Sequence, residues 1–154
     1  MTDITPKYHK EKMIKSVMMV DDDIDDRQMF EEAIKTVNPV VSVNTAKNGE
    51  EALDRLAVPP PPDVIFLDLN MPVMNGYECL ENLKKSDRYK DIPVIIYSTA
   101  DDSATIKKTQ ELGAQGFFKK PAKFKDLKIK LQTLLTGVIP VAGQKELSLT
   151  SYII

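Results

Sequence analysis

Residues 63–76 read Asp-Val-Ile-Phe-Leu-Asp-Leu-Asn-Met-Pro-Val-Met-Asn-Gly, and this stretch decides the fold. Four consecutive apolar residues, 64–67, have the length and the β-branched or aromatic character of a strand buried on both faces. The strand ends at Asp68, Pro72 prevents its continuation, and Asn75-Gly76 marks a turn before a helical pattern. The stretch therefore predicts a strand, an acidic tip, a loop and a helix, and open α/β sheets bind ligands at such tips.

The size and composition of the chain limit the classes of protein to consider. A length of 154 residues suits one domain, expected at 16–136, with tails at 1–15 and 137–154 and no room for an output domain. The formal charge of −2 does not favour direct DNA binding. We expect a cytoplasmic protein without membrane association, because the sequence has no signal peptide and no apolar run long enough to cross a bilayer. The single cysteine, Cys79, lies in a helical pattern and is expected to be a small buried hydrophobe.

Strand and helix patterns alternate along the chain. Candidate strands lie at residues 17–20, 40–43, 64–67, 94–97 and 116–118. Helical patterns begin near residues 25, 49, 76, 103 and 123. Five strands alternating with five helices predict a doubly wound α/β fold with a five-stranded parallel sheet. The tail after residue 137 contains Leu147 and Leu149 and ends in Tyr-Ile-Ile, a pattern that allows either an edge strand or a disordered end.

In such a sheet, the carboxyl ends of all strands share one edge, and polar residues follow them here. Asp21 to Asp23 follow the first strand, Asp68 the third, Ser98 and Thr99 the fourth, and Lys120 the fifth. An isolated Asp after a strand can merely open a loop, but crowded carboxylates persist most easily with a bound cation or a nearby lysine. Oxygen ligands without Cys or His suit Mg²⁺ or Mn²⁺. Asp68 could then attack phosphorus, with Lys120 and the Ser98 hydroxyl as donors to the phosphoryl oxygens.

These residues and their order resemble the receiver domain of two-component response regulators. The shared features are the acidic pair after the first strand, Asp-x-Asn-Met-Pro-x-Met-x-Gly after the third, Ser after the fourth and Lys-Pro after the fifth. The resemblance implies a flavodoxin-like strand order of 2-1-3-4-5. It implies Asp68 as the phosphoacceptor, Lys120 and Ser98 as catalytic residues, and Ser98 with Phe117 as the switch. The implied metal ligands are the side chains of Asp21, Asp22 and Asp68 and the backbone carbonyl of Asn70, and Lys120–Pro121 is implied to be a cis peptide.

The resemblance implies a single-domain response regulator, chemotaxis-receiver-like, rather than an enzyme with a separate substrate. It would accept a phosphoryl group from a sensor histidine kinase or a histidine phosphotransfer protein, and would catalyse only its own phosphorylation and dephosphorylation. Phosphorylation would switch the binding of a downstream protein that the sequence does not identify, and a homodimer is left open. The alternative function is an unphosphorylated receiver-like scaffold or interaction module. A haloacid-dehalogenase-like phosphatase is disfavoured, because Asn70 stands where that class needs a second acid.

Overall fold

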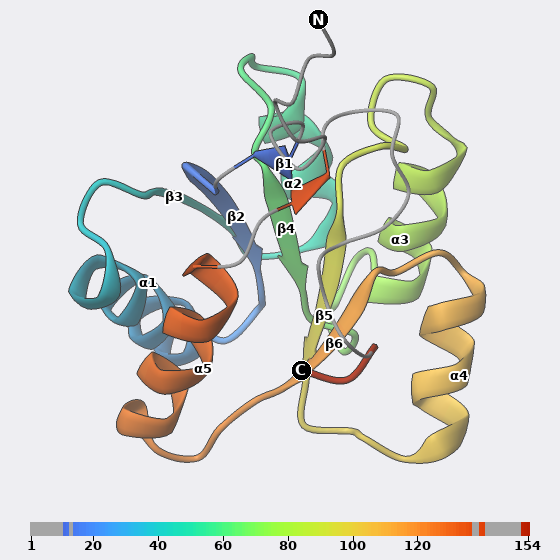
Figure 1. Cartoon of the computed structure of the whole chain (residues 1–154). Helices are drawn as coiled ribbons and strands as arrows, with labels where there is room; N and C mark the ends of the chain where they lie inside the picture. Colours follow the sequence, from blue (N-terminus) through green and yellow to red (C-terminus); the bar gives the residue numbers. More distant parts are fainter. Residues whose placement is uncertain (1–10, 13, 137–138, 141–151) are drawn as a thin grey trace, which may run out of the picture.

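The computed structural model describes residues 11–12, 14–136, 139–140 and 152–154. Its centre is a parallel five-stranded sheet with the strand order β3-β2-β4-β5-β6 (Figure 1). Numbered from β2, the sheet has the predicted order 2-1-3-4-5. The strands of this sheet are β2 (Ser16–Val20), β3 (Ser42–Ala46), β4 (Val64–Leu67), β5 (Val94–Ser98) and β6 (Gly116–Lys119).

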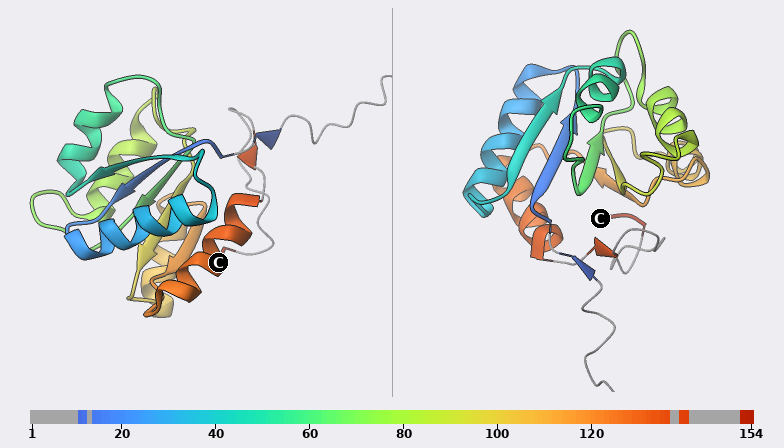
Figure 2. Two further views of the ribbon diagram at one scale, coloured as in Figure 1. Left: turned by 90° about the vertical axis from the view of Figure 1, so that its left-hand side faces the viewer. Right: turned by 90° about the horizontal axis from the view of Figure 1, so that it is seen from above.

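The helices form two layers on the faces of the sheet (Figure 2). The helices of the described residues are α1 (Ile24–Val37), α2 (Gly49–Leu56), α3 (Gly76–Lys85), α4 (Ser103–Glu111) and α5 (Phe124–Thr136). One core cluster joins the sheet to α1 and α5, and a second joins it to α2, α3 and α4. Helices cover both faces of β4, and all four of its residues are buried, as the apolar run 64–67 predicts. None of the described helices is long and apolar enough to cross a membrane.

One local prediction needs correction, whereas the helix start expected near residue 25 is confirmed at Ile24. The strand expected at 40–43 lies at Ser42–Ala46, and Val40 is 84% exposed. This strand pairs with β2 alone and its exposed positions are polar, so its apolar signal is weak and the two valines before it, Val40 and Val41, misplace the start. The helix expected near Asp25 is capped by Asp23, whose carboxylate accepts hydrogen bonds from the N–H groups of Asp25 and Asp26.

The loop after β4 is tightly constrained. A Cβ atom on Gly76 would lie 2.1 Å from the backbone oxygen of Asp68, so only glycine allows this close approach. Within the same loop Val73 has a φ of +70°, a conformation that is costly for a β-branched residue. The loop therefore folds back against the end of β4, at the edge of the sheet where Asp68 lies.

Segments from the two expected tails also have structure. The short strand β1 (Glu11–Lys12) pairs antiparallel with β7 (Ile139–Pro140), and Ile14 is buried in the core. Residues 152–154 return to the sheet and form a parallel bridge with β6. The edge-strand alternative for the end of the chain is therefore correct at these residues, whereas Leu147 and Leu149 lie outside the described residues.

Candidate functional site: a carboxylate cluster at the sheet edge

The residues that directly follow the strands still make backbone hydrogen bonds with the neighbouring strands. The Asp21 N–H donates to the carbonyl oxygen of Ala46 at 3.0 Å, and the Asp68 N–H donates to that of Val20 at 2.9 Å. On the other side of β4, the Lys120 N–H donates to the carbonyl oxygen of Ser98 at 3.0 Å. The candidate side chains therefore project from backbone that the hydrogen bonds of the sheet still hold.

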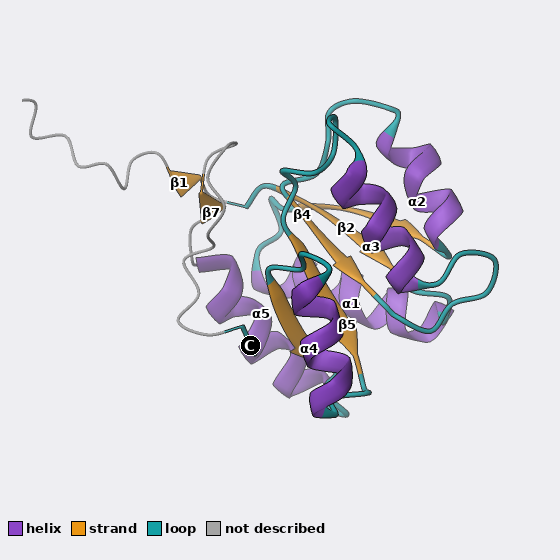
Figure 3. Cartoon of the chain, turned by 90° about the vertical axis from the view of Figure 1, so that its right-hand side faces the viewer, coloured by secondary structure: helices purple, strands orange, loops and turns teal. Residues whose placement is uncertain are grey.

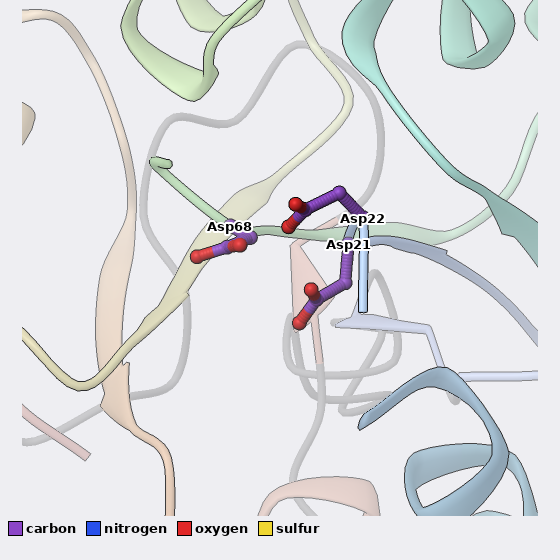
Figure 4. A group of neighbouring side chains, drawn as sticks. All are labelled: Asp21, Asp22 and Asp68. Carbon is purple, nitrogen blue, oxygen red and sulfur yellow. The ribbon is translucent and has the colours of Figure 1, made fainter. Parts of the chain in front are cut away.

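Three carboxylates meet at this edge. Each of Asp21, Asp22 and Asp68 offers an oxygen, and these oxygens all lie within 4.8 Å of one another (Figure 4). Asp21 is fully buried and Asp68 is 5% exposed, whereas Asp22 faces solvent. The structure thus brings together the predicted acidic residues of the first and third strands.

Lys120 supplies positive charge to the cluster. Its Nζ lies 2.8 Å from Asp21 Oδ2 and 3.7 Å from Asp68 Oδ1. It also donates a hydrogen bond of 2.9 Å to Asp26 Oδ2, a contact that sequence reasoning missed. Asp23 caps the start of α1, whereas Asp26 pairs with Lys120. Asp26 lies in the first turn of α1, and nothing in the sequence links it to a lysine 94 residues away.

The surroundings of Asp68 disfavour its negative charge. Burial, followed by the neighbouring Asp21 carboxylate, raises the pKa of Asp68 to about 7, although Lys120 and the Leu69 N–H act in the opposite direction. Burial likewise raises the pKa of Asp21. For Lys120, burial disfavours the ammonium form, but the neighbouring carboxylates of Asp21 and Asp26 outweigh burial and raise its pKa. In the absence of a cation, the site therefore holds more negative charge than Lys120 compensates.

One buried carboxylate oxygen at this site has no hydrogen-bond donor among the described residues. Asp21 Oδ1 accepts a hydrogen bond from the Asp23 N–H, but Asp21 Oδ2 is buried and receives none from the described residues. Lys120 approaches this oxygen to 2.8 Å without the alignment of a hydrogen bond. A hard divalent cation coordinated by carboxylate oxygens fits this arrangement, since it would use a lone pair that the protein leaves unfilled.

Among the described residues, no hydrogen bond joins the remaining predicted site residues to the Asp68 side chain. Ser98 is buried at the end of β5, and its Oγ accepts a hydrogen bond of 3.1 Å from the Ala100 N–H. Phe117 is fully buried in β6, and Asn70 is exposed in the loop two residues after Asp68. The Lys120–Pro121 peptide was expected to be cis, and this expectation is wrong. Among the described residues the cis peptide bond is Pro59–Pro60.

Comparison with known proteins decides the family. The model of the response regulator receiver domain matches residues 17–132. The chain belongs to the response regulator receiver domain family. As a receiver domain it is similar to the two-component response regulator ARR17 of Arabidopsis thaliana, at 35% identity over 130 residues that cover 77% of this chain and 84% of the relative. It spans 58% of the length of a second Arabidopsis thaliana response regulator.

Solved structures of other receiver domains have the same fold. The phosphorylated cyanobacterial phytochrome response regulator RcpA superposes with a TM-score of 0.71 at 28% identity, covering 78% of this chain and 90% of that one. The Mn²⁺-bound form of response regulator Rcp1 gives a TM-score of 0.69 at 27% identity, covering 78% and 91%. Members of this receiver family accept phosphoryl groups from histidine kinases or phosphotransfer proteins and bind Mg²⁺ or Mn²⁺ at an acidic site.

Proposed function

We propose that this receiver domain, at residues 16–136, accepts a phosphoryl group on Asp68 from a histidine kinase or a histidine phosphotransfer protein. The observation that supports this proposal is the position of Asp68, a nearly buried carboxylate at the carboxyl end of the central strand, between two further acids and a lysine. Its buried side chain is held by a hydrogen bond of 2.9 Å from the Leu69 N–H to Oδ1. The backbone that follows Asp68 therefore orients its carboxylate, which is the nucleophile that attacks phosphorus.

The transfer uses the chain's own residues in separate roles. An oxygen of the Asp68 carboxylate forms a bond to phosphorus while the bond from phosphorus to the donor nitrogen breaks, and the bonding electrons stay on the imidazole. Lys120 lies 3.7 Å from Asp68 and offers its ammonium to the oxygens of the transferring group. A Mg²⁺ or Mn²⁺ ion held by Asp21, Asp22 and Asp68, with the carbonyl of Asn70 as a further ligand, would supply the charge that keeps Asp68 ionised.

Ser98 and Phe117 are proposed to transmit the phosphorylated state. The Ser98 hydroxyl is free to donate, because its described hydrogen bond uses the oxygen as an acceptor from Ala100. A phosphoryl group on Asp68 offers three acceptor oxygens, so Ser98 would turn toward it and leave space for Phe117. The signal would then pass to the surface formed by β6 and its neighbouring helices.

Mass spectrometry after incubation with acetyl phosphate and Mg²⁺ tests the proposal. The wild-type protein should gain one acyl phosphate, and Asp68→Asn should gain none. Asp87→Asn is the matched control, because it removes an exposed carboxylate that pairs with Lys90 at 3.2 Å. Equal labelling of Asp68→Asn would assign the phosphate to another residue, and absence of labelling in the wild type would favour the alternative of an unphosphorylated scaffold.

A further inference from the structure

The outer edge of β6 is occupied by another part of the same chain. As the last strand of the sheet, β6 would otherwise expose backbone N–H and C=O groups. The Phe117 N–H donates to the Tyr152 carbonyl oxygen, and the Ile154 N–H donates to the Phe117 carbonyl oxygen, both at 2.8 Å. Residues 152–154 therefore add to the sheet as a short parallel strand, where the carboxyl end of the chain returns to β6 (Figure 1).

The side chains of this segment are recognised on both faces of the sheet. Tyr152 packs on the core cluster beneath α3 and α4, and Ile154 packs on the cluster beneath α1 and α5. Figure 3 shows the end of the chain beside α4 and α5, the two helices that flank β6. The segment thus packs at the edge of both core clusters, and these side-chain contacts add to the two backbone hydrogen bonds.

A buried threonine gives the contact chemical selectivity. The Tyr152 hydroxyl lies 2.8 Å from the Oγ1 of Thr109, which is fully buried and belongs to α4. Thr109 already donates its one hydroxyl proton to the Ile106 carbonyl oxygen at 2.9 Å, so Tyr152 donates to Thr109. On the other side, Lys130 Nζ lies 3.4 Å from the main-chain oxygen of Ile154. A phenol at the first position and a main-chain oxygen at the third are therefore both recognised.

We infer that the outer edge of β6 is a peptide-docking surface and that residues 152–154 are its intramolecular ligand. The surface takes an extended peptide by parallel strand addition, with a tyrosine followed two positions later by a β-branched apolar residue. A protein partner with such a segment must displace residues 152–154, which are tethered and therefore present at high effective concentration. The contacts lie apart from the carboxylate cluster, so the inference does not depend on phosphorylation of Asp68.

Amide hydrogen exchange of the full chain tests the docked state. The Phe117 amide should exchange at least about tenfold faster in Tyr152→Ala than in the wild type. Without the tyrosine side chain the segment should leave the edge of β6, and the main-chain oxygen of residue 152 would no longer accept from the Phe117 N–H. Tyr152→Phe, which removes only the hydroxyl that contacts Thr109, should give a smaller increase. Tyr89→Ala is the matched control, since Tyr89 packs on the same core cluster but lies in the loop before β5. It should leave the exchange of Phe117 unchanged.

Fluorescence anisotropy with a labelled synthetic peptide of residues 148–154 tests the docking surface. The peptide should bind full-length Tyr152→Ala at least about tenfold more tightly than the wild type, because the tethered segment no longer competes. The same peptide with alanine in place of tyrosine should lose this binding.

Three results would overturn the inference. The first is a Phe117 amide that exchanges equally in the wild type and in Tyr152→Ala. The second is a peptide that binds both proteins equally or binds neither. The third is protection of Phe117 that rises with protein concentration over about a tenfold range, which would assign the docked segment to a second copy of the chain.

Discussion

Replacement of Asp68 by asparagine should stabilise the metal-free protein at neutral and alkaline pH. Asparagine keeps the shape of the side chain, and its oxygen can still accept the hydrogen bond from the Leu69 N–H that now goes to Asp68 Oδ1 at 2.9 Å. The substitution removes a charge that burial and Asp21 disfavour. A residue essential to the proposed function is therefore expected to lower the stability of the fold in the absence of a cation.

The size and pH dependence of this effect follow from the pKa of Asp68. A rise from 3.8 to about 7 corresponds to a ceiling of about 4 kcal/mol, at 1.36 kcal/mol for each unit. Because Asp21 titrates in the same cluster and shares the cost, we expect about half of this value, roughly 2 kcal/mol. A raised pKa means that the folded protein holds the proton more tightly. Protonation of Asp68 therefore stabilises the folded wild type relative to its unfolded chain below about pH 4, and this stabilisation is lost as the pH rises to about 7.

Urea unfolding in EDTA measures the prediction at about pH 4 and about pH 8. The free energy of unfolding of Asp68→Asn should be close to that of the wild type at the lower pH and higher at the upper pH. Asp87→Asn provides the control for loss of one surface carboxylate and should differ little from the wild type at either pH. An Asp68→Asn advantage that is absent at pH 8, or that is equal at both values, would refute the electrostatic reasoning.

Three further predictions test the metal site, the loop and the switch. Mg²⁺ at about a hundred times its dissociation constant should stabilise the wild type by about 2.7 kcal/mol in thermal melts at matched ionic strength, and Asp22→Ala should lose most of this gain without being less stable in EDTA, whereas Asp25→Ala should keep it. Val73→Gly should raise the free energy of unfolding in urea by about 1 kcal/mol more than Val73→Ala, because Val73 has a φ of +70° and its side chain is 73% exposed; equal values would show that the loop is not strained. Beryllofluoride should shift amide NMR signals at Phe117 and over residues 101–135, and shifts confined to the surroundings of Asp68 would contradict the proposed switch.

The sequence predicted the parts of the site that follow directly from strands. A run of apolar residues such as 64–67 must be buried on both faces, and the parallel order then brings Asp21, Asp68 and Lys120 to one edge. The same reasoning failed at β3, where an edge strand with polar exposed positions has little apolar periodicity. Prediction succeeded where burial requires apolar residues, as in β4. It was less accurate where exposure to solvent permits several residue types, as in β3.

Contacts between distant side chains could not be predicted in the same way. The hydrogen bond between Tyr152 and Thr109 spans 43 residues, and neither residue belongs to a periodic pattern that requires the other. The tail pattern left an edge strand open but gave no indication of which strand it would join. Pairing through backbone groups leaves little trace in residue types, so only the three-dimensional structure identifies β6 as the partner.

The position of Lys120 explains why the site is poised for change. Its ammonium is closest to Asp21 and Asp26, at 2.8 and 2.9 Å, and is farther from Asp68, at 3.7 Å, so Asp68 receives the least compensation. A phosphoryl group on Asp68 would replace one negative charge with nearly two and add acceptor oxygens, which strengthens the attraction of Lys120 toward Asp68 and away from Asp26. Lys120 directly follows β6, three residues after Phe117, whose backbone holds residues 152–154. The strand that carries the lysine of the site therefore also carries the edge at which the end of the chain is bound.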